Sequence, residues 1–203
     1  MKHINLSEIQ SWERFYRGNF INSLSGFKSA SLIGTINKNE QTNLAVFSNI
    51  IHLGADPALI AFQNRPKAAS PHTIANIEAT GVYTINHIQT NFIEQAHQTS
   101  AKYLDAVSEF DAVGLTPQFI PNIKAPFVKE SHIKYALKLK EIVEIKLNGT
   151  FLVIGSITDV LLNDQLIETD GFIAAEKNNS ICSLGVDAYY TTQLIQRLPY
   201  AKP

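Results

Sequence analysis

Three side chains near the middle of the chain have the types and the spacing to bind an anion such as a phosphate group. Arg65 carries a planar guanidinium that can hold two oxygen atoms, and His72 and Thr73 follow it closely. Ser70 and Pro71 suit the capping residue and the first residue of a helix. The first helical turn has unpaired N–H groups and a partial positive charge, so a phosphate can sit there. The alternative is an ordinary capped helix that binds nothing.

Two short runs of β-prone residues must position this helix. Residues 44–53 and 58–62 are apolar, and the turn-forming residues 54–57 separate them, so we expect two adjacent strands. Arg65 follows the second strand, and the helix is expected to begin near Pro71.

The other elements are read from their periodicity. We expect a leading helix over residues 7–17 that ends at Gly18, because Ile9, Trp12 and Tyr16 stand at helical spacing. The polar turn at residues 37–41 predicts a hairpin between a strand at 29–36 and the strand that begins at Leu44. The pattern then predicts a strand at 81–88, a helix at 91–98 and a structured excursion over the barrel surface at 105–126.

Near the C-terminal end, Asn148-Gly149 is a strong hairpin signal between long β-prone segments at 135–147 and 150–162. Six or seven strands with helices inserted between them favour a mainly β fold, an antiparallel barrel with helices around it. The sequence contains no G-x-G-x-x-G motif and no P-loop, so any nucleotide must bind in another way.

The composition is typical of a globular protein, and we expect one domain over residues 1–203 with an N-terminal helix and a C-terminal extension. Hydrophobic residues make up 45% and charged residues 17%, which leaves room for a buried interface in a homo-oligomer. The net charge of −1 gives no reason to expect a nucleic-acid partner. No apolar run reaches the roughly 18 residues that a bilayer requires, so we expect a cytoplasmic protein that does not contact a membrane.

Cys182 is the single cysteine, so no intramolecular disulfide can form and a reducing compartment is favoured. It lies in an apolar run, where we expect a small buried hydrophobe without a chemical role. The six histidines show no metal-ligand spacing, so we expect no metal site: His3, His52, His72, His87, His97 and His132. Of these, His52 and His87 lie near expected strand ends and are interpreted as structural or surface residues.

Several short segments occur in an order that resembles one known family. They are Asn-x-Ala-x-Phe-Ser at residues 43–48, Asp56-Pro57, Asn64-Arg65-Pro66, His72-Thr73-x-x-Asn76-Ile77 and Tyr83-Thr84-Ile85-Asn86. Together they resemble the flavin reductase-like family, and most closely its flavoredoxin-like branch. The resemblance extends over nearly the whole chain. It implies an antiparallel split β-barrel of the FMN-binding type.

The resemblance also implies an FMN at the interface of a homodimer, with the flavin ring near the end of one strand. The ring would lie beside Phe47, Ser48, Asn49 and Ile50. The side chains of Ser48 and Asn49 can pair with the polar pyrimidine edge of the ring, and Phe47 and Ile50 offer packing surface. The alternative is an ordinary strand end in the core.

The phosphate of this FMN would be held by Arg65, by the Thr73 hydroxyl and by the helix start. His72 would add a donor when it is protonated, although a solvated histidine is an equal alternative. Lys28 precedes a strand and is interpreted as a solvated lysine.

The activity that the resemblance implies is an FMN-dependent oxidoreductase. NADH or NADPH would supply electrons, and a small molecule or a protein would accept them, so we expect no catalytic side chain. Many reductases of the family carry a histidine a few residues before the glycine that matches Gly155, whereas Thr150 stands there in this sequence. A non-enzymatic flavin carrier or sensor is therefore the second possibility. A third, an interaction domain without a ligand, requires the Arg65 arrangement to be a coincidence.

Overall fold

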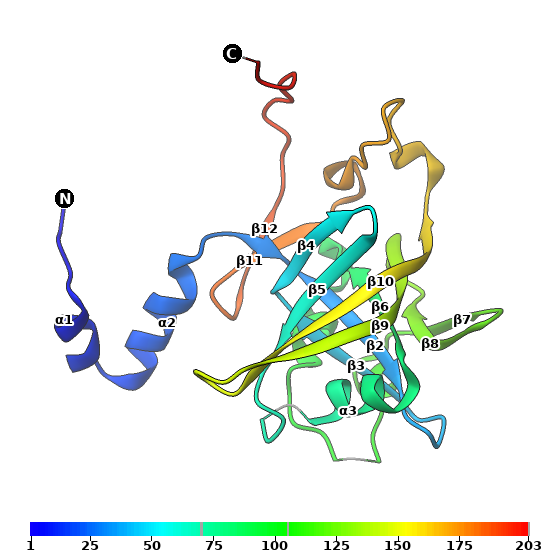
Figure 1. Cartoon of the computed structure of the whole chain (residues 1–203), viewed down its shortest axis with the longest axis horizontal. Coiled ribbons are helices and arrows are strands. Elements are labelled where there is room, and N and C mark those ends of the chain that lie inside the picture. Colours follow the sequence, from blue (N-terminus) through cyan, green and yellow to red (C-terminus); the bar gives the residue numbers. More distant parts are fainter. Residues whose placement is uncertain (70, 105, 203) are drawn as a thin grey trace.

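A seven-stranded antiparallel sheet forms the centre of the computed structural model, which describes residues 1–69, 71–104 and 106–202 (Figure 1). The spatial order of the strands is β3-β2-β6-β9-β10-β5-β4. Their bounds are β2 Ser31–Ile36, β3 Thr42–Phe47, β4 Ile50–Ala55, β5 Ala58–Asn64, β6 Val82–His87, β9 Ile133–Ile145 and β10 Thr150–Leu162. In the described part of the chain, β3 and β4 do not pair, so the sheet does not close. This confirms the expected mainly β, antiparallel split barrel.

Both predicted hairpins are present, and their turn residues explain them. The Asn37 side chain accepts hydrogen bonds from the backbone N–H groups of Asn39 at 2.8 Å and Gln41 at 3.0 Å, which closes the turn between β2 and β3. Gly149 has a φ of 70°, a conformation that glycine adopts without strain, between β9 and β10. The strand expected at 81–88 and the helix expected at 91–98 are also confirmed.

The expectation of one strand over residues 44–53 is wrong. Strand β3 ends at Phe47 and β4 begins at Ile50, and these two strands lie at opposite ends of the sheet. The chain therefore changes direction at Ser48 and Asn49. Both halves of the run are apolar, so its periodicity does not reveal the break.

The helix expected at 7–17 is instead two helices, α1 Leu6–Ser11 and α2 Arg14–Leu24. The chain leaves helical geometry at Trp12, and Glu13 starts α2 by accepting hydrogen bonds from the N–H groups of Phe15 and Tyr16 at 2.8 and 3.2 Å. Helix α2 runs through Gly18 because glycine is tolerated inside a helix at modest cost. The two helices project away from the barrel as an N-terminal arm, residues 1–24 (Figure 1).

Helices cover parts of the sheet and of its edges. They are α3 Pro71–Thr80, α4 Ile93–Gln98, α5 Glu109–Val113 and short 3-10 turns at Thr90–Phe92, Asp164–Leu166 and Ala175–Asn178. Helix α3 begins where the sequence predicted, although its expected capping residue, Ser70, lies outside the described residues. Among these described helices, none is long and apolar enough to cross a membrane.

The segment expected to run over the barrel surface at 105–126 also contributes to the buried core. Its first residue, Asp105, lies outside the described residues. The segment contains α5 and the small hairpin of β7 Pro117–Ile120 and β8 Ile123–Val128. Phe127 and Val128 of β8 are fully buried. Gly34 makes this possible, because a methyl group there would collide with the carbonyl oxygen of Pro126.

Two hydrophobic clusters hold the barrel together. One contains eight fully buried residues, Ile33, Phe62, Ile74, Ile77, Tyr83, Ile85, Leu137 and Val153, so it joins α3 to the sheet. The other lies under α4, α5 and β8 and includes Leu32, Leu44, Phe92, Phe110 and Val128. Since α3, β3 and α5 all have buried members in these clusters, the barrel positions their ends firmly.

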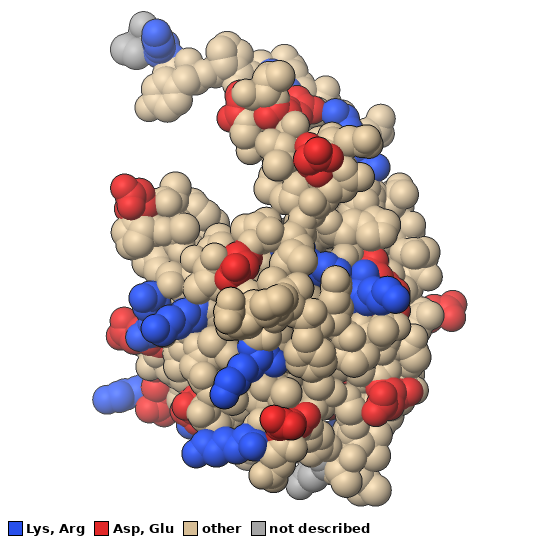
Figure 2. Space-filling model, turned by 90° about the vertical axis from the view of Figure 1, so that its right-hand side faces the viewer, with Lys and Arg blue, Asp and Glu red and all other residues tan. Residues whose placement is uncertain are grey.

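The chain ends in a small third sheet and an extended tail. Strands β1 Lys28–Ser29, β11 Ile181–Leu184 and β12 Ala188–Thr191 form the sheet, and the C-terminal tail, residues 192–202, stands off the body (Figure 1, Figure 2). On the face drawn in Figure 2, basic and acidic residues are interspersed. Cys182 in β11 is half-buried, so it is less enclosed than the sequence predicted.

Candidate functional site

A cavity of about 440 Å³ lies between the end of β3, the start of α3 and two loops. Six of the seven cofactor-binding residues predicted from the sequence line it: Phe47, Ser48, Asn49, Arg65, His72 and Thr73. The seventh, Ile50, does not line the cavity and packs against the cluster that joins α3 to the sheet. Residues from three separate segments therefore meet in one space.

One corner of the cavity is suited to an anion. Arg65 follows β5 with an exposed side chain, and Thr73 lies buried in the first turn of the ten-residue helix α3. The Asn43 side chain donates to the Thr73 hydroxyl oxygen at 3.3 Å, so the hydroxyl hydrogen can be donated to a ligand. With the N–H groups of the first turn of α3, these side chains form the anion corner.

Glu109, the first residue of α5, lines the same cavity and was not predicted from the sequence. Its carboxylate accepts a hydrogen bond from the backbone N–H of Leu44 at 3.0 Å, which fastens α5 to β3. Burial raises the pKa of Glu109, whereas the Leu44 hydrogen bond and the charge of His72 oppose that rise. In the sequence, Glu109 looks like any acidic residue in a first helical turn.

The other end of the cavity is formed where the chain leaves β3. Ser48 and Asn49 are half-buried there, and the Asn49 carbonyl accepts from the N–H of Gln63 at 3.2 Å. The Phe47 ring is fixed edge-on against Phe62, with 5.0 Å between the centroids. This end therefore combines hydroxyl and amide groups with a positioned aromatic surface.

Thr150, which the resemblance matches to a histidine of the family, contacts this end of the cavity through Gln63. Its hydroxyl accepts from the Gln63 side chain at 3.1 Å and donates to Asn148 at 2.7 Å. Gln63 itself lines the cavity, so Thr150 orients a lining residue without lining the cavity itself.

Two further lining segments were also missed by the sequence analysis. One is the loop of Thr99, Ser100, Ala101, Lys102 and Tyr103, and the other is the β11–β12 hairpin with Ser183, Gly185, Val186 and Tyr189. The Tyr189 hydroxyl lies 2.9 Å from Nδ1 of His97, which ties this hairpin to α4. Neither segment has a motif that would have identified it.

The remaining candidates from the sequence lie elsewhere. His52 is exposed within β4, and burial lowers the pKa of His87 to about 4 at the end of β6. The Lys28 ammonium donates to the carbonyl of Asn22 at 3.1 Å. Among the described residues, no three His, Cys, Asp or Glu side chains are grouped to hold a metal ion.

Comparison with known proteins gives matches along most of the chain. The family model for the flavin reductase like domain matches residues 25–180. A crystal structure from Shewanella frigidimarina, described as a flavin reductase with a split barrel domain, is 48% identical and has a TM-score of 0.96. The match covers 99% of this chain and 100% of that one.

More distant structures share the fold. Nitrilotriacetate monooxygenase component B from Bacillus cereus is 21% identical, with a TM-score of 0.84 and 98% of each chain covered. Flavoredoxin of Desulfovibrio vulgaris is 23% identical, with a TM-score of 0.74, over 86% of this chain and 92% of that one. Since the family model spans more than half of the sequence, the expected family is confirmed, and the chain belongs to the flavin reductase-like domain family.

Proposed function

We propose that the cavity binds FMN, with the phosphate in the anion corner and the flavin ring at the end of β3. The observation that carries this proposal is that one cavity joins an arginine and a helix start to a polar strand end beside an aromatic ring. The volume of about 440 Å³ lies within the roughly 300–1,000 Å³ of small-molecule sites. The donors and the size therefore fit a phosphorylated, planar cofactor.

Each lining residue has a distinct part in this proposal. Arg65 and the Thr73 hydroxyl would pair with phosphate oxygens, and His72 beside them would add a donor. Ser48, Asn49 and nearby backbone groups would pair with the pyrimidine edge, and Phe47 would contact the ring. Ile50 lies just outside the lining, and we propose that it supports the ring site by packing against the cluster below.

The proposed activity is that of an oxidoreductase. Bound FMN would supply the redox chemistry, taking electrons from NADH or NADPH and passing them to a small-molecule or protein acceptor. The residues of this chain would bind and orient the cofactor, and we propose no catalytic side chain. The single cysteine supports the further proposal of a reducing, cytoplasmic location.

A visible absorption spectrum of the purified protein tests both parts of the proposal. FMN is added, excess FMN is removed, and the bound flavin is then exposed anaerobically to NADH or NADPH. We expect bound yellow flavin that bleaches with one of the two donors. Failure to bind FMN above the level of an unrelated protein would contradict the proposal.

A non-enzymatic flavin carrier or sensor is the second candidate, and Thr150 favours it. The family position that often carries a histidine holds a hydroxyl engaged by Gln63 and Asn148. Bound flavin that neither nicotinamide can bleach would support this second candidate. Steady consumption of NADH or NADPH with bound flavin would eliminate it.

A further inference from the structure

A series of hydrogen bonds leads from the β9–β10 turn to the cavity through Asn148, Thr150 and Gln63. Its first donor is unambiguous, because the backbone N–H of Thr150 donates to the side-chain oxygen of Asn148 at 3.2 Å. The oxygen of the Asn148 amide, and not the nitrogen, must therefore face Thr150. The Thr150 hydroxyl lies 2.7 Å from the same oxygen, so it donates its single hydrogen there.

This assignment fixes the orientation of the Gln63 amide. Since the hydrogen of the Thr150 hydroxyl is given to Asn148, the hydroxyl oxygen can only accept from Gln63. The Gln63 atom that lies 3.1 Å from Thr150 Oγ1 is accordingly the nitrogen, Nε2. The oxygen, Oε1, makes no hydrogen bond with any described residue and is not among the described atoms that are buried without a partner. Because Gln63 lines the cavity, this acceptor is open to a ligand.

Gln63 stands between the two ends of the cavity. Its backbone N–H donates to the Asn49 carbonyl at 3.2 Å, at the end where the flavin ring is proposed to bind. Arg65 of the anion corner follows two residues later, so the two lining side chains are roughly 7 Å apart along the chain. In FMN, the hydroxyl-bearing ribityl chain joins the ring to the phosphate. A bound FMN would therefore carry its ribityl chain past Gln63.

We propose that Gln63 accepts a hydrogen bond from a ribityl hydroxyl and that Thr150 is the positioning residue that aims it. The inference rests on the proposed function, because it assigns a further contact to the same cofactor. A carbonyl oxygen can only accept, so it selects a ligand that supplies an O–H or N–H group at this point. Apart from one N–H on its pyrimidine edge, the oxidised flavin ring offers acceptors, which Oε1 disfavours.

The surroundings of the β9–β10 turn hold this acceptor at a fixed distance from the anion corner. A methyl group at Gly149 would lie 3.9 Å from the Pro66 ring. The Lys67 ammonium lies 5.4 Å from the centroid of the Phe151 ring and pairs with Glu78 of α3 at 2.6 Å. The turn therefore contacts the loop between β5 and α3, which is the loop that forms the anion corner.

Fluorescence titration of the full chain with three flavins tests the proposal. FMN carries the ribityl chain and the phosphate, riboflavin lacks the phosphate, and lumiflavin lacks both. Gln63→Met keeps the length of the side chain and removes the acceptor. We expect this variant to raise the Kd for FMN and for riboflavin by the same factor, roughly two- to tenfold, and to leave the Kd for lumiflavin unchanged.

A second pair of variants tests the positioning role of Thr150. Thr150→Val removes the hydroxyl with little change of shape and frees the Gln63 amide to turn. If the two amide orientations become equally populated, only half of the molecules present Oε1, so the Kd for FMN and riboflavin should rise roughly twofold. Thr150→Ser keeps the hydroxyl and should restore the native values. A purely structural role of Thr150 would instead weaken the binding of lumiflavin as well.

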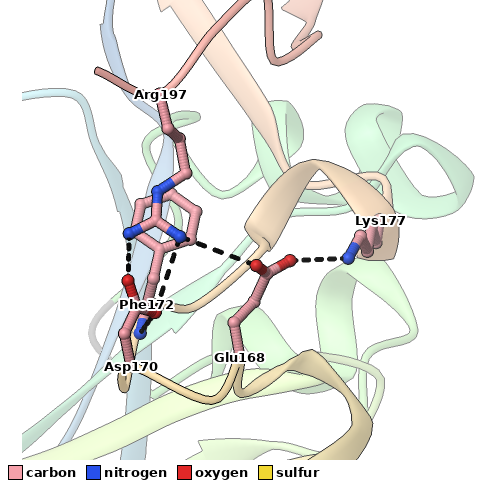
Figure 3. A network of polar contacts seen from close by, with 5 residues as sticks. All are labelled: Glu168, Asp170, Phe172, Lys177 and Arg197. Atoms are coloured by element: carbon pink, nitrogen blue, oxygen red, sulfur yellow. Dashed lines mark hydrogen bonds and ion pairs between the residues drawn. The ribbon is translucent and has the colours of Figure 1, made fainter. Parts of the chain in front are cut away.

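The polar network of the C-terminal tail offers a matched control (Figure 3). The Arg197 guanidinium pairs with Asp170 and lies 3.6 Å from Glu168, which Lys177 contacts at 2.7 Å. None of these four residues lines the cavity. Arg197→Gln therefore disrupts a hydrogen-bonded network elsewhere in the chain, and the Kd values for all three flavins should match those of the native protein. Circular dichroism of each variant verifies that it is folded.

The outcomes separate this inference from the proposed function. Equal losses for lumiflavin and riboflavin in Gln63→Met would overturn the inference, because the acceptor would then face the ring. Native affinities of folded Gln63→Met for all three flavins would also overturn it, while FMN binding itself would stand. A native protein that binds none of the three flavins would contradict the proposed function and this inference together.

Discussion

Two cavities of nearly equal size differ in the hydrogen bonds that their basic side chains make. The first, of about 440 Å³, contains Arg65, whose side chain makes no hydrogen bond or ion pair with any described residue. The second, of about 410 Å³, contains Lys134. The Lys134 ammonium donates to the Gln118 side chain at 2.6 Å and to the carbonyls of Val128 and Lys129 at 2.8 and 3.2 Å.

The difference shows that a cation in a hollow is not by itself a binding site. All three donors of Lys134 are engaged, and burial lowers its pKa, so it braces β9 against the β7–β8 hairpin. His132 in the same hollow is 2.9 Å from the Asn178 side chain. Arg65 instead keeps its donors available beside a helix start, which is what an incoming phosphate requires.

The largest expected effect concerns His87, which adjoins the second cavity through the hydrogen bond from Ser131 to its carbonyl at 2.8 Å. Burial lowers the pKa of folded His87 to about 4, from about 6.5 in the unfolded chain. The unfolded chain therefore binds more protons between these values, so stability falls as the pH drops from about 6.5 towards 4, by on the order of 3 kcal/mol. Urea unfolding across this range measures the loss.

A His87→Gln variant serves as the control, since comparing its pH profile with the native one isolates this histidine from other titrating groups. We expect a flatter profile for the variant. Equal slopes for the two proteins would show that His87 is not buried in its neutral form.

Removal of the Arg65 charge is expected to weaken FMN binding strongly. A charge-assisted hydrogen bond contributes about 1.5–3 kcal/mol, so Arg65→Gln should raise the Kd for FMN roughly 10- to 100-fold. Riboflavin lacks the phosphate, and its affinity should stay unchanged in the variant. Fluorescence titration measures both ligands. A similar loss for riboflavin would mean that Arg65 does not contact the phosphate.

Lys134→Met should have the opposite effect to Arg65→Gln: we expect it to lower the free energy of unfolding and to leave the Kd for FMN unchanged. The substitution removes the donor of three acceptors, and we expect a loss of about 1–3 kcal/mol in the free energy of unfolding. Urea titration and FMN titration of the same preparation separate the two effects. If the Lys134→Met variant folds but binds FMN more weakly than the native protein, the conclusion that Lys134 has only a structural role would be contradicted.

The smallest expected effect is at Thr73. Thr73→Val removes the hydroxyl that we propose donates to the phosphate. A hydrogen bond to a charged group contributes about 1.5–3 kcal/mol, and the lower end of this range corresponds to a roughly tenfold higher Kd for FMN. Thr73→Ser keeps the hydroxyl and should bind FMN like the native protein. If Thr73→Ser weakens binding as much as Thr73→Val, packing of the methyl group is the cause.

Much of the barrel was predictable, because local rules determine it. Asn148-Gly149 identified the β9–β10 hairpin, and Pro71 marked the start of α3. The break at Ser48 and Asn49 was not predictable, because the residues on both sides are equally apolar. Only the tertiary arrangement, which sends β3 and β4 to opposite ends of the sheet, requires it.

The candidate site was predictable where its residues lie close together in sequence. Arg65, His72 and Thr73 belong to one strand–helix connection, so their proximity follows from local structure. Glu109 and Lys102 reach the cavity through packing between distant segments, and their sequence surroundings are those of ordinary surface residues. Tertiary contacts also decide whether a basic side chain can donate hydrogen bonds to a ligand. The Lys134 ammonium already donates to three acceptors of the protein, and this could not be read from the sequence.

The most direct test of the FMN proposal compares two ligands on the native protein. Fluorescence titration with FMN and with riboflavin, under identical conditions, isolates the contribution of the phosphate. Arg65 and the start of α3 predict that FMN binds about tenfold more tightly than riboflavin, or better. Equal affinities, or no binding of FMN, would contradict a phosphate site at this corner of the cavity.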